Sequence, residues 1–380
     1  MNCEILNTKK SQSETGLNII VAGSEIDSKW NEYVQNHAEG TIYHNSSWLN
    51  IIEKESVQKV IKLACIDGNN DINGIFPLQY TAGFPFGLGG VPGAKRLSSL
   101  PRTPCGGPLT SNPTATQALI EKAVSIISHD SGRLLQIKSY MVNLNKKVES
   151  LNKYLWREIY LKEIPDYPDE IRFGNSKNHT SVKWAVNKAK KNGVAYRVAD
   201  SLEDLKTWYK LYLDTMRYNT TPARSFSFYK NIWEILKPKR LMQLVLAELN
   251  ENGKKIIISG NILFFYNKTV THAFNGSSRK HFKLRPNDIL HWQAIFDAQR
   301  DGYKYYDLGE VSKDNSGLAA YKKKWSSTIW KMYHYYYPKP VQLEAEDLDA
   351  ETIGGMKGNI WQLLPLNLTA KIGGLVFKKL

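Results

Sequence analysis

The sequence predicts a mixed α/β protein built from two similar halves. Each half shows helices, then two β-rich runs joined by a Gly/Asn turn, then a loop, a helix and a strand. The two turns read Asp67-Gly68-Asn69-Asn70 and Asn250-Glu251-Asn252-Gly253, and such turns are typical of β-hairpins. A chain of 380 residues also exceeds one ordinary hydrophobic core, which favours two domains.

The first domain is expected over residues 17–155, behind a flexible polar tail at residues 1–16. Its elements follow from the spacing of apolar residues and from polar residues at helix starts. The predicted strands cover residues 17–22, 59–66, 72–80 and 134–140, and the predicted helices cover residues 27–37, 46–55 and 114–128. Residues 83–108 are rich in Gly and Pro, which excludes regular structure throughout that stretch.

The second domain is expected over residues 156–340, followed by a C-terminal tail at 341–380. Gly193 is a good stop for one helix, and Ser201 to Asp204 fits a capping box that opens the next. The predicted strands cover residues 157–164, 194–199, 241–249, 255–266, 269–274 and 303–308. The predicted helices cover residues 176–191, 201–218, 225–236, 286–300 and 318–325.

The composition favours a protein with an anionic partner. The formal net charge is +15 and the isoelectric point is about 9.4. Such a charge suits a phosphorylated substrate, a tRNA or an acidic membrane face; the alternative is a well-solvated basic surface. The spacing of Cys3, Cys65 and Cys105 fits neither a zinc site nor a disulfide framework, and no metal is expected.

The sequence predicts a cytoplasmic protein. Residues 1–16 are polar and lack the apolar core of a signal peptide. The longest apolar run, residues 256–266, is too short to span a bilayer. Residues 360–380 are mostly apolar with interspersed lysines, so they can lie in a membrane interface. Such a placement would make the protein peripheral at the inner face of the membrane. Packing of this tail on the domain or on a partner chain is the alternative.

The most informative stretch for chemistry runs from Asn275 to Trp325. A predicted strand leads there into a basic loop and then a helix starting at Pro286, whose free N–H groups and dipole favour an anion. The residues expected to bind substrate are Arg279, Lys283, Arg285, Asn287, Tyr321 and Lys324. Arg285 can give bidentate contacts to the anion. The alternative is a basic loop in which Asn287 or Asp288 merely caps the helix.

Two residues of this stretch are candidate catalytic groups. Asp307 ends a Tyr-rich strand just before Gly309, where a carboxylate can serve as a base or orient an amine; the alternative is a capping or salt-bridging Asp. Lys322, in a run of three lysines, can stabilise a developing oxyanion or a phosphate. Successive helical residues point in different directions, so at most two of the three lysines face one site; a solvated face is the alternative.

Other features carry weaker signals. The loop at residues 278–283 has no glycine, and backbone approach to a diphosphate normally needs glycines. This argues against an acetyl-CoA site of the usual kind.

The lysine face of helix 176–191 can track a nucleic-acid backbone, with a solvated face as the alternative. His272, His281 and His291 lack a metal-ligand spacing and are treated as ordinary residues.

The order of several motifs resembles that of the FemABX peptidyltransferases and of FemAB-like acyltransferases of the GNAT superfamily. The matching motifs are His44-Asn-Ser-Ser-Trp-Leu49, the Gly-rich stretch from Phe86-Gly87 through Leu100-Pro101 to Gly106-Gly-Pro108, Lys188 to Val194, Gly276-Ser277, Leu284 to Trp292, Gly302 to Gly309, Gly317-Leu318 and Tyr321 to Trp325. The resemblance covers roughly residues 40–335.

The resemblance implies two GNAT-like domains with mixed central sheets flanked by helices. It also implies transfer of an acyl group, in the best-known members an aminoacyl group from aminoacyl-tRNA, to an amine of a cell-wall precursor. Lys322 falls at the family's Phe-Lys position, with Tyr321 in place of Phe, and Arg285 and Asn287 fall in its second-domain binding loop. No long helical hairpin is inserted. Relatives in which this motif ends in Lys-x-Lys-Trp are often implicated in surface polysaccharide assembly.

Three hypotheses about function follow. The first is an acyl- or aminoacyl-transferase forming an amide on a phosphate-bearing precursor of peptidoglycan or surface polysaccharide, with aminoacyl-tRNA or acyl-CoA as co-substrate and no bound cofactor. The second is an acetyl-CoA-dependent N-acetyltransferase acting on an amino sugar. The third is a non-catalytic RNA-binding or assembly protein, which would bind tRNA with a steep salt dependence.

Overall fold

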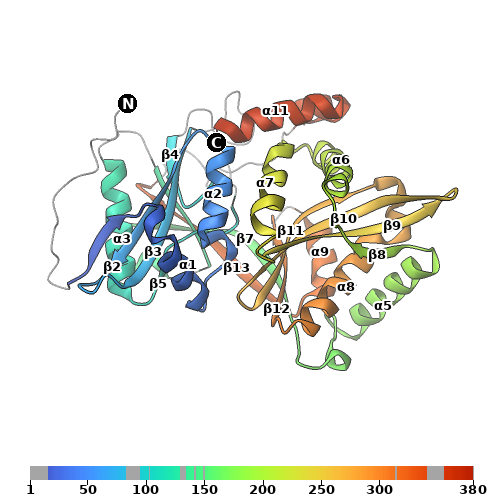
Figure 1. The fold of residues 1–380 in the computed structure, drawn as a ribbon, viewed down its shortest axis with the longest axis horizontal. Helices are drawn as coiled ribbons and strands as arrows, with labels where there is room; N and C mark the ends of the chain where they lie inside the picture. Colours follow the sequence, from blue (N-terminus) through green and yellow to red (C-terminus); the bar gives the residue numbers. More distant parts are fainter. Residues whose placement is uncertain are drawn as a thin grey trace.

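The computed structural model describes residues 16–82, 95–101, 103–128, 134–140, 143–148, 150–312, 315–339 and 355–379. Most of the predicted flexible tail, and the motif residues Phe86 and Gly87, lie outside these ranges. The described strands form one sheet that runs through both halves of the molecule (Figure 1). Its order is β1-β2-β3-β4-β6-β13-β7-β12-β11-β10-β9-β8, with β5 paired to β3.

The bounds of the strands follow the hairpins expected from the sequence. The strands of the first half are β1 (Asn18–Val21), β2 (Val60–Ile66), β3 (Ile72–Ala82), β4 (Lys95–Ser98), β5 (Leu109–Thr110) and β6 (Leu134–Ser139). Those of the second half are β7 (Asn152–Glu163), β8 (Ala195–Val198), β9 (Met242–Glu251), β10 (Lys254–Tyr266), β11 (Thr269–Ser277), β12 (Tyr305–Val311) and β13 (Thr328–Tyr337).

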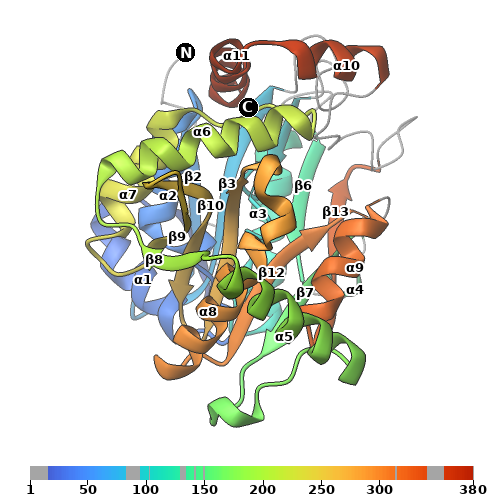
Figure 2. The same ribbon diagram turned by 90° about the vertical axis from the view of Figure 1, so that its right-hand side faces the viewer.

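Helices cover both faces of this sheet (Figure 2). The first half carries α1 (Asp27–Asn36), α2 (Ser46–Glu55), α3 (Pro113–Ser128) and α4 (Leu144–Lys147). The second half carries α5 (Ser176–Lys191), α6 (Leu202–Tyr218), α7 (Phe226–Leu236), α8 (Pro286–Arg300) and α9 (Ser316–Trp325). Two further helices, α10 (Gly355–Leu363) and α11 (Leu366–Lys379), end the described chain. The predicted mixed α/β class, with mixed sheets flanked by helices, is confirmed, and the sheets expected in the two halves form one continuous sheet.

Two neighbouring strands join the halves. β13 pairs antiparallel with β6 of the first half on one side and with β7 on the other. The predicted domain boundary at residue 155 falls inside β7, which begins at Asn152 because β13 pairs with it from Asn152 to Leu161. β13 lies beyond residue 325, the end of the last predicted element, and it makes the sheet continuous.

Aromatic side chains pack across the same junction. Trp48 of α2 lies edge-on to Phe264 of β10 and Phe228 of α7, with ring centroids 5.4 and 6.0 Å apart. Trp48 is fully buried. Edge-to-face pairs add about 0.5–1.5 kcal/mol each beyond the burial of apolar area. The helix that carries the His44–Leu49 motif is therefore fixed against the second half.

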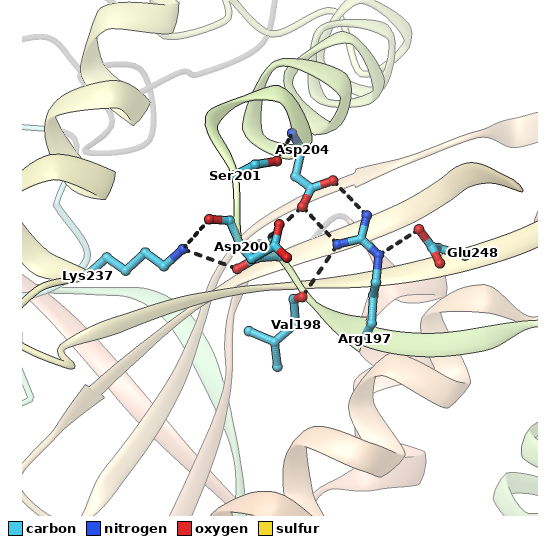
Figure 3. Close-up of polar contacts among 8 residues, drawn as sticks. Arg197, Val198, Asp200, Ser201, Asp204, Lys237 and Glu248 are labelled. Atoms are coloured by element: carbon cyan, nitrogen blue, oxygen red, sulfur yellow. Dashed lines mark hydrogen bonds and ion pairs between the residues drawn. The ribbon is translucent and has the colours of Figure 1, made fainter.

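An ion-pair network fixes the edge strand β8 to α6 (Figure 3). Arg197 donates from Nη1 and Nη2 to the Asp204 carboxylate at 2.8 and 2.6 Å, and from Nε to Glu248 Oε1 at 2.6 Å. The Arg197 guanidinium lowers the pKa of Asp204 to about 2. Ser201 Oγ accepts from the Asp204 backbone N–H at 3.2 Å, so the helix start predicted at Ser201 is confirmed.

Replacing Trp48 tests whether the halves form one cooperative core. Trp48→Ala removes a buried indole that packs on both halves, and such truncations cost about 3–5 kcal/mol. The free energy of unfolding, measured by denaturant titration, is expected to fall by that amount. Trp184→Ala is the matched control, because Trp184 on α5 is 53 % exposed; its expected effect is below about 1 kcal/mol. Equal effects of the two substitutions would contradict the shared core.

Candidate functional site

The candidate site lies where two parallel strands separate. β11 and β12 pair only from Thr269 with Tyr305 to Thr271 with Asp307. Beyond that point β11 runs on to Ser277 and β12 to Val311 without pairing to each other. On its other side β12 pairs with β7 through an irregularity between Asp307 and Glu310. The last paired residue, Asp307, therefore stands at the fork of the two strands.

Gly309 makes room at this fork for Lys322. Its φ of +83° lies in the left-handed region, which other residues rarely adopt. A Cβ at Gly309 would lie 3.3 Å from Lys322 Nζ. The Gly309 backbone N–H donates to Asp307 Oδ1 at 2.7 Å, and Lys322 Nζ donates to the Glu310 carbonyl at 3.0 Å. One turn of backbone thus positions both the carboxylate and the amine.

Burial shifts the pKa values of these two groups toward neutrality, and their opposite charges partly counteract that shift. Desolvation raises the pKa of Asp307 to about 6, against the lowering effects of the Gly309 N–H and the Lys322 charge. Desolvation also lowers the pKa of Lys322 to about 8, against the raising effects of Asp307 and Glu310. Near pH 7, Asp307 is largely ionised and can accept a proton, while Lys322 is largely protonated and can stabilise negative charge.

Three adjoining cavities meet at these residues. The central cavity, of about 300 Å³, is lined by Tyr43 and Lys138 of the first half and by Asp307, Glu310 and Lys322 of the second. A larger cavity of about 700 Å³ lies between the halves and shares Asp307 with it. An outer cavity of about 440 Å³ lies against α6, α8 and α9 and shares Lys322. Two reactants can therefore approach Asp307 and Lys322 from different sides.

The first half contributes residues that sequence reasoning did not assign to the site. Lys138 of β6 is buried and lines the central cavity together with Tyr140 and Trp156. The β6 sequence carries no local signal that Lys138 lines a cavity. Its position relative to β12 is set by the pairing of β13 and β7, which lie between the two strands. The site is therefore composite, with charged residues from both halves.

Two motifs of the family resemblance meet beside the larger cavity. His44 Nε2 lies 3.1 Å from the Gly107 carbonyl, and His44 Nδ1 lies 2.9 Å from Thr41 Oγ1. Burial lowers the pKa of His44 to about 4, so its imidazole is neutral at pH 7. Both His44 and Gly107 line the cavity. His44 thus ties the loop before α2 to the Gly-Gly-Pro stretch.

His272 and His291, treated as ordinary in the sequence, lie beside Lys322. Their rings are 4.8 Å apart, and His291 Nδ1 lies 3.0 Å from Tyr306 Oη. His272 lines both the central and the outer cavity. Burial, aided by the Lys322 charge, lowers the pKa of His272 to about 3 and that of His291 well below its usual value. Both imidazoles are therefore neutral near pH 7.

The predicted substrate-binding residues divide into two groups. Asn287 and Tyr321 line the outer cavity with Lys322. Asn287 Oδ1 accepts from Ser259 Oγ at 2.7 Å and from Ser277 Oγ at 2.8 Å, so its amide also ties α8 to β10 and β11. Among the lysines of α9, Lys322 is buried, Lys323 is exposed and Lys324 lies 4.8 Å from the Tyr321 ring centroid.

The other basic residues predicted to bind substrate lie away from the three cavities. In the described chain, Arg279, Lys283, Arg285 and Lys324 line none of them. The Arg279 guanidinium stacks 3.3 Å from the centroid of Tyr218, and that of Arg285 lies 5.6 Å from Trp184. At the start of α8 the carboxyl group of Asp288 is buried, and desolvation raises its pKa. A role for these residues in substrate binding stays a prediction.

The described residues contain no cluster of three or more His, Cys, Asp or Glu side chains placed to hold a metal ion. Within the same ranges, no helix has the length and apolar character needed to cross a membrane.

Comparison with known proteins identifies the fold. A family model described as "Acetyltransferase (GNAT) domain" matches residues 176–323. The crystal structure of FemX superposes with a TM-score of 0.65 at 16% identity, covering 85% of this chain and 98% of that chain. The fold expected from the resemblance to the FemABX proteins is confirmed. No curated protein matches the chain in sequence.

Two lipid-related proteins share the fold. The C-terminal domain of a putative lysylphosphatidylglycerol synthetase from Agrobacterium fabrum aligns with a TM-score of 0.55 at 12% identity, covering 86% of this chain and 94% of that chain. L-PGS from Bacillus licheniformis aligns with a TM-score of 0.56 at 11% identity, covering 85% and 94%. At these identities the two proteins, like FemX, show a shared fold.

The coupling between Asp307 and Lys322 can be measured directly. The Lys322 amine is expected to titrate near pH 8, and Asp307→Asn is expected to lower that pKa further by removing a stabilising negative charge. Reductive ¹³C-methylation followed by NMR at varied pH reports the titration, with a Lys322→Arg sample assigning the signal. An ordinary lysine pKa that Asp307→Asn leaves unchanged would contradict the described geometry.

Proposed function

We propose that the protein transfers an acyl or aminoacyl group to an amine of a cell-envelope component. The observation that carries this proposal is the meeting of Asp307 and Lys322 at the fork between β11 and β12, in a cavity reached from two sides. The fold shared with FemX, with the domain of a putative lysylphosphatidylglycerol synthetase and with L-PGS supports an envelope acceptor.

The residues of the fork suit amide formation. The Asp307 carboxylate takes a proton from the acceptor ammonium, and the freed amine nitrogen attacks the carbonyl carbon of the donor. A C–N bond forms, and the carbonyl electrons move to oxygen beside the Lys322 ammonium. When the carbonyl reforms, the bond to the donor's oxygen or sulfur breaks, and that leaving atom takes up a proton. The protonated Asp307 carboxyl is within this cavity to return it, and the attacking nitrogen releases its extra proton to solvent as the neutral amide forms.

The two sides of the fork suit different reactants. The larger cavity between the halves has room for the acceptor and reaches Asp307. The outer cavity reaches Lys322 and carries the polar side chains of Asn275, Asn287 and Tyr321, which suits the donor. In this assignment the acceptor amine meets Asp307 and the donor carbonyl meets Lys322. A phosphate-bearing precursor also suits the net charge of +15.

Acyl-CoA is the second candidate donor, because the acetyltransferase model matches residues 176–323. Against it, the segment Arg279–Leu284 before α8 contains no glycine, and Asp288 places a carboxylate at the helix start. The third hypothesis is a non-catalytic RNA-binding or assembly protein. A transfer assay distinguishes it from the first two, because a non-catalytic protein forms no product.

Calorimetric titration distinguishes the donors. We expect acetyl-CoA to bind weakly or not at all, because the backbone before α8 lacks the glycines that let a diphosphate approach. An aminoacyl-tRNA is expected to bind with an affinity that falls steeply as salt rises. Tight, saturable binding of acetyl-CoA would instead assign the protein as an acetyltransferase.

Variants at the fork test the catalytic roles. Lys322→Met is expected to lower kcat/KM by about 10²–10³-fold, the usual loss of one oxyanion-stabilising donor. Lys323→Met, its exposed neighbour on α9, is the matched control and is expected to leave kcat/KM within about twofold. Full activity of Lys322→Met would remove Lys322 from the mechanism.

The pH dependence of kcat/KM belongs to the same test. Asp307 must be ionised, so the rate rises with pH through about 6; Lys322 must be protonated, so the rate falls through about 8. Because the two groups are coupled, these limbs belong to the pair. Asp307→Asn is expected to abolish the acid limb, and Lys322→Arg to move the basic limb to higher pH. A flat profile from about pH 5 to about pH 9, one unit beyond each of the two pKa values, would contradict both roles.

A further inference from the structure

The C-terminal helices α10 and α11 form a layer that the transfer chemistry does not use. Both helices contact α6. α11 lies at the top of the molecule in two perpendicular views (Figures 1 and 2), and Figure 2 shows α10 beside it. Gln362 of α10 donates to the Tyr218 carbonyl at 2.7 Å, and Arg217 of α6 donates to the Leu364 carbonyl at 3.2 Å. The pair is therefore attached to the body of the protein at a defined place.

One face of α11 is committed to this attachment. Gly373 packs so closely on Ala223 that a Cβ there would collide with the Ala223 carbonyl oxygen. The Phe377 ring lies 4.6 Å from the Arg224 guanidinium, and the Lys378 carbonyl accepts from the Val57 N–H at 3.1 Å. α11 thus touches both halves of the molecule, and its rotation about its own axis is fixed.

The opposite face of α11 displays leucines and lysines to solvent. Leu368, Lys371, Leu375 and Lys378 are all exposed, and their spacing of three, four and three residues places them on one side of a helix. Leu368 is 42 % exposed and Leu375 is 63 % exposed. On α10 and the turn after it, Ile360 is 56 % exposed and Leu363 is 85 % exposed. This face is called here the Leu/Lys face. Its exposed apolar side chains are less stable in water than in an apolar environment.

The charge on this segment has one sign. From Gly355 to Leu380 the sequence contains four lysines and no Asp or Glu. Lysines beside exposed leucines let the apolar side chains enter a lipid interface while the ammonium groups stay at the level of the headgroups. Anionic lipids attract such lysines, and the net charge of +15 adds a long-range attraction.

We propose that the Leu/Lys face of α10 and α11 binds the surface of an anionic lipid bilayer. This placement brings the outer cavity close to the membrane, because Arg224 and Phe377, which hold α11, also line that cavity. The binding itself does not depend on the proposed transfer reaction.

Two other occupants fit the same face less well. A second copy of the chain, related by a two-fold axis, would bring Lys371 and Lys378 of one copy toward those of the other, and like charges oppose such contacts. A nucleic acid would pair with the lysines but leave the leucines in water. Of these three occupants, the lipid interface satisfies both kinds of side chain.

Vesicle co-sedimentation of the full chain tests the proposal. The protein is expected to bind vesicles of phosphatidylcholine with phosphatidylglycerol much more tightly than vesicles of phosphatidylcholine alone. Leu363→Ser with Leu368→Ser and Leu375→Ser is expected to weaken binding by at least about a hundredfold, because three apolar anchors are lost. Lys371→Gln with Lys378→Gln is expected to weaken binding to the anionic vesicles by about fivefold for each lysine.

Matched controls distinguish the face from total charge. Lys183→Gln with Lys190→Gln removes two exposed lysines of α5. If the effect is specific to α11, vesicle binding by this variant is expected to change less than twofold. Circular dichroism confirms that each variant is folded. Transfer to a soluble acceptor is expected to stay unchanged in the leucine variant, so failure of the membrane proposal and of the proposed function can be told apart.

Three outcomes would overturn the proposal. The first is that the protein binds both kinds of vesicle equally. The second is that neither the leucine variant nor the lysine variant of α11 weakens vesicle binding. The third is that the unaltered chain is a dimer, which the leucine substitutions dissociate without any effect on vesicle binding.

Discussion

The separation of β11 from β12 after Asp307 is the constraint on which the site depends. The strands share a parallel ladder for three residue pairs and then part, which leaves space between them in the middle of a continuous sheet. Gly309, with its positive φ, turns the backbone so that one N–H holds Asp307 while the next carbonyl accepts from Lys322. Any side chain at Gly309 would press on the Lys322 amine.

The joining of the halves completes the site. Because β13 and β7 lie between β6 and β12, Lys138 and Tyr140 from the first half reach the cavity that holds Asp307 and Lys322. The aromatic contacts of Trp48 hold α2 against β10 in the same region. Burial among these side chains moves the pKa values of both groups toward neutrality. The same packing that stabilises the fold therefore makes the two groups suitable for proton transfer and charge stabilisation near pH 7.

Local signals predict much of the fold but little of the assembly of the site. α5 and α8 cover the residues expected of them, because polar N-cap residues, Pro286 and Gly193 mark helix ends within the sequence. β13 and the extension of β7 back to Asn152 were not predicted, since their pairing joins residues far apart in the chain. Helical periodicity limited how many lysines of α9 could face the site, but only tertiary packing selects Lys322. His272 and Lys138 carry no local mark, and their places beside the cavity follow from topology.

A structure with a stable bisubstrate analogue, in which acceptor and acyl group are already joined as an amide, tests the central claim most directly. The account predicts that the amide oxygen lies about 2.7–3.1 Å from Lys322 Nζ, with the amide nitrogen beside the Asp307 carboxylate and the two arms of the analogue in the outer and larger cavities. An analogue bound elsewhere, with Asp307 and Lys322 contacting only the protein, would contradict it.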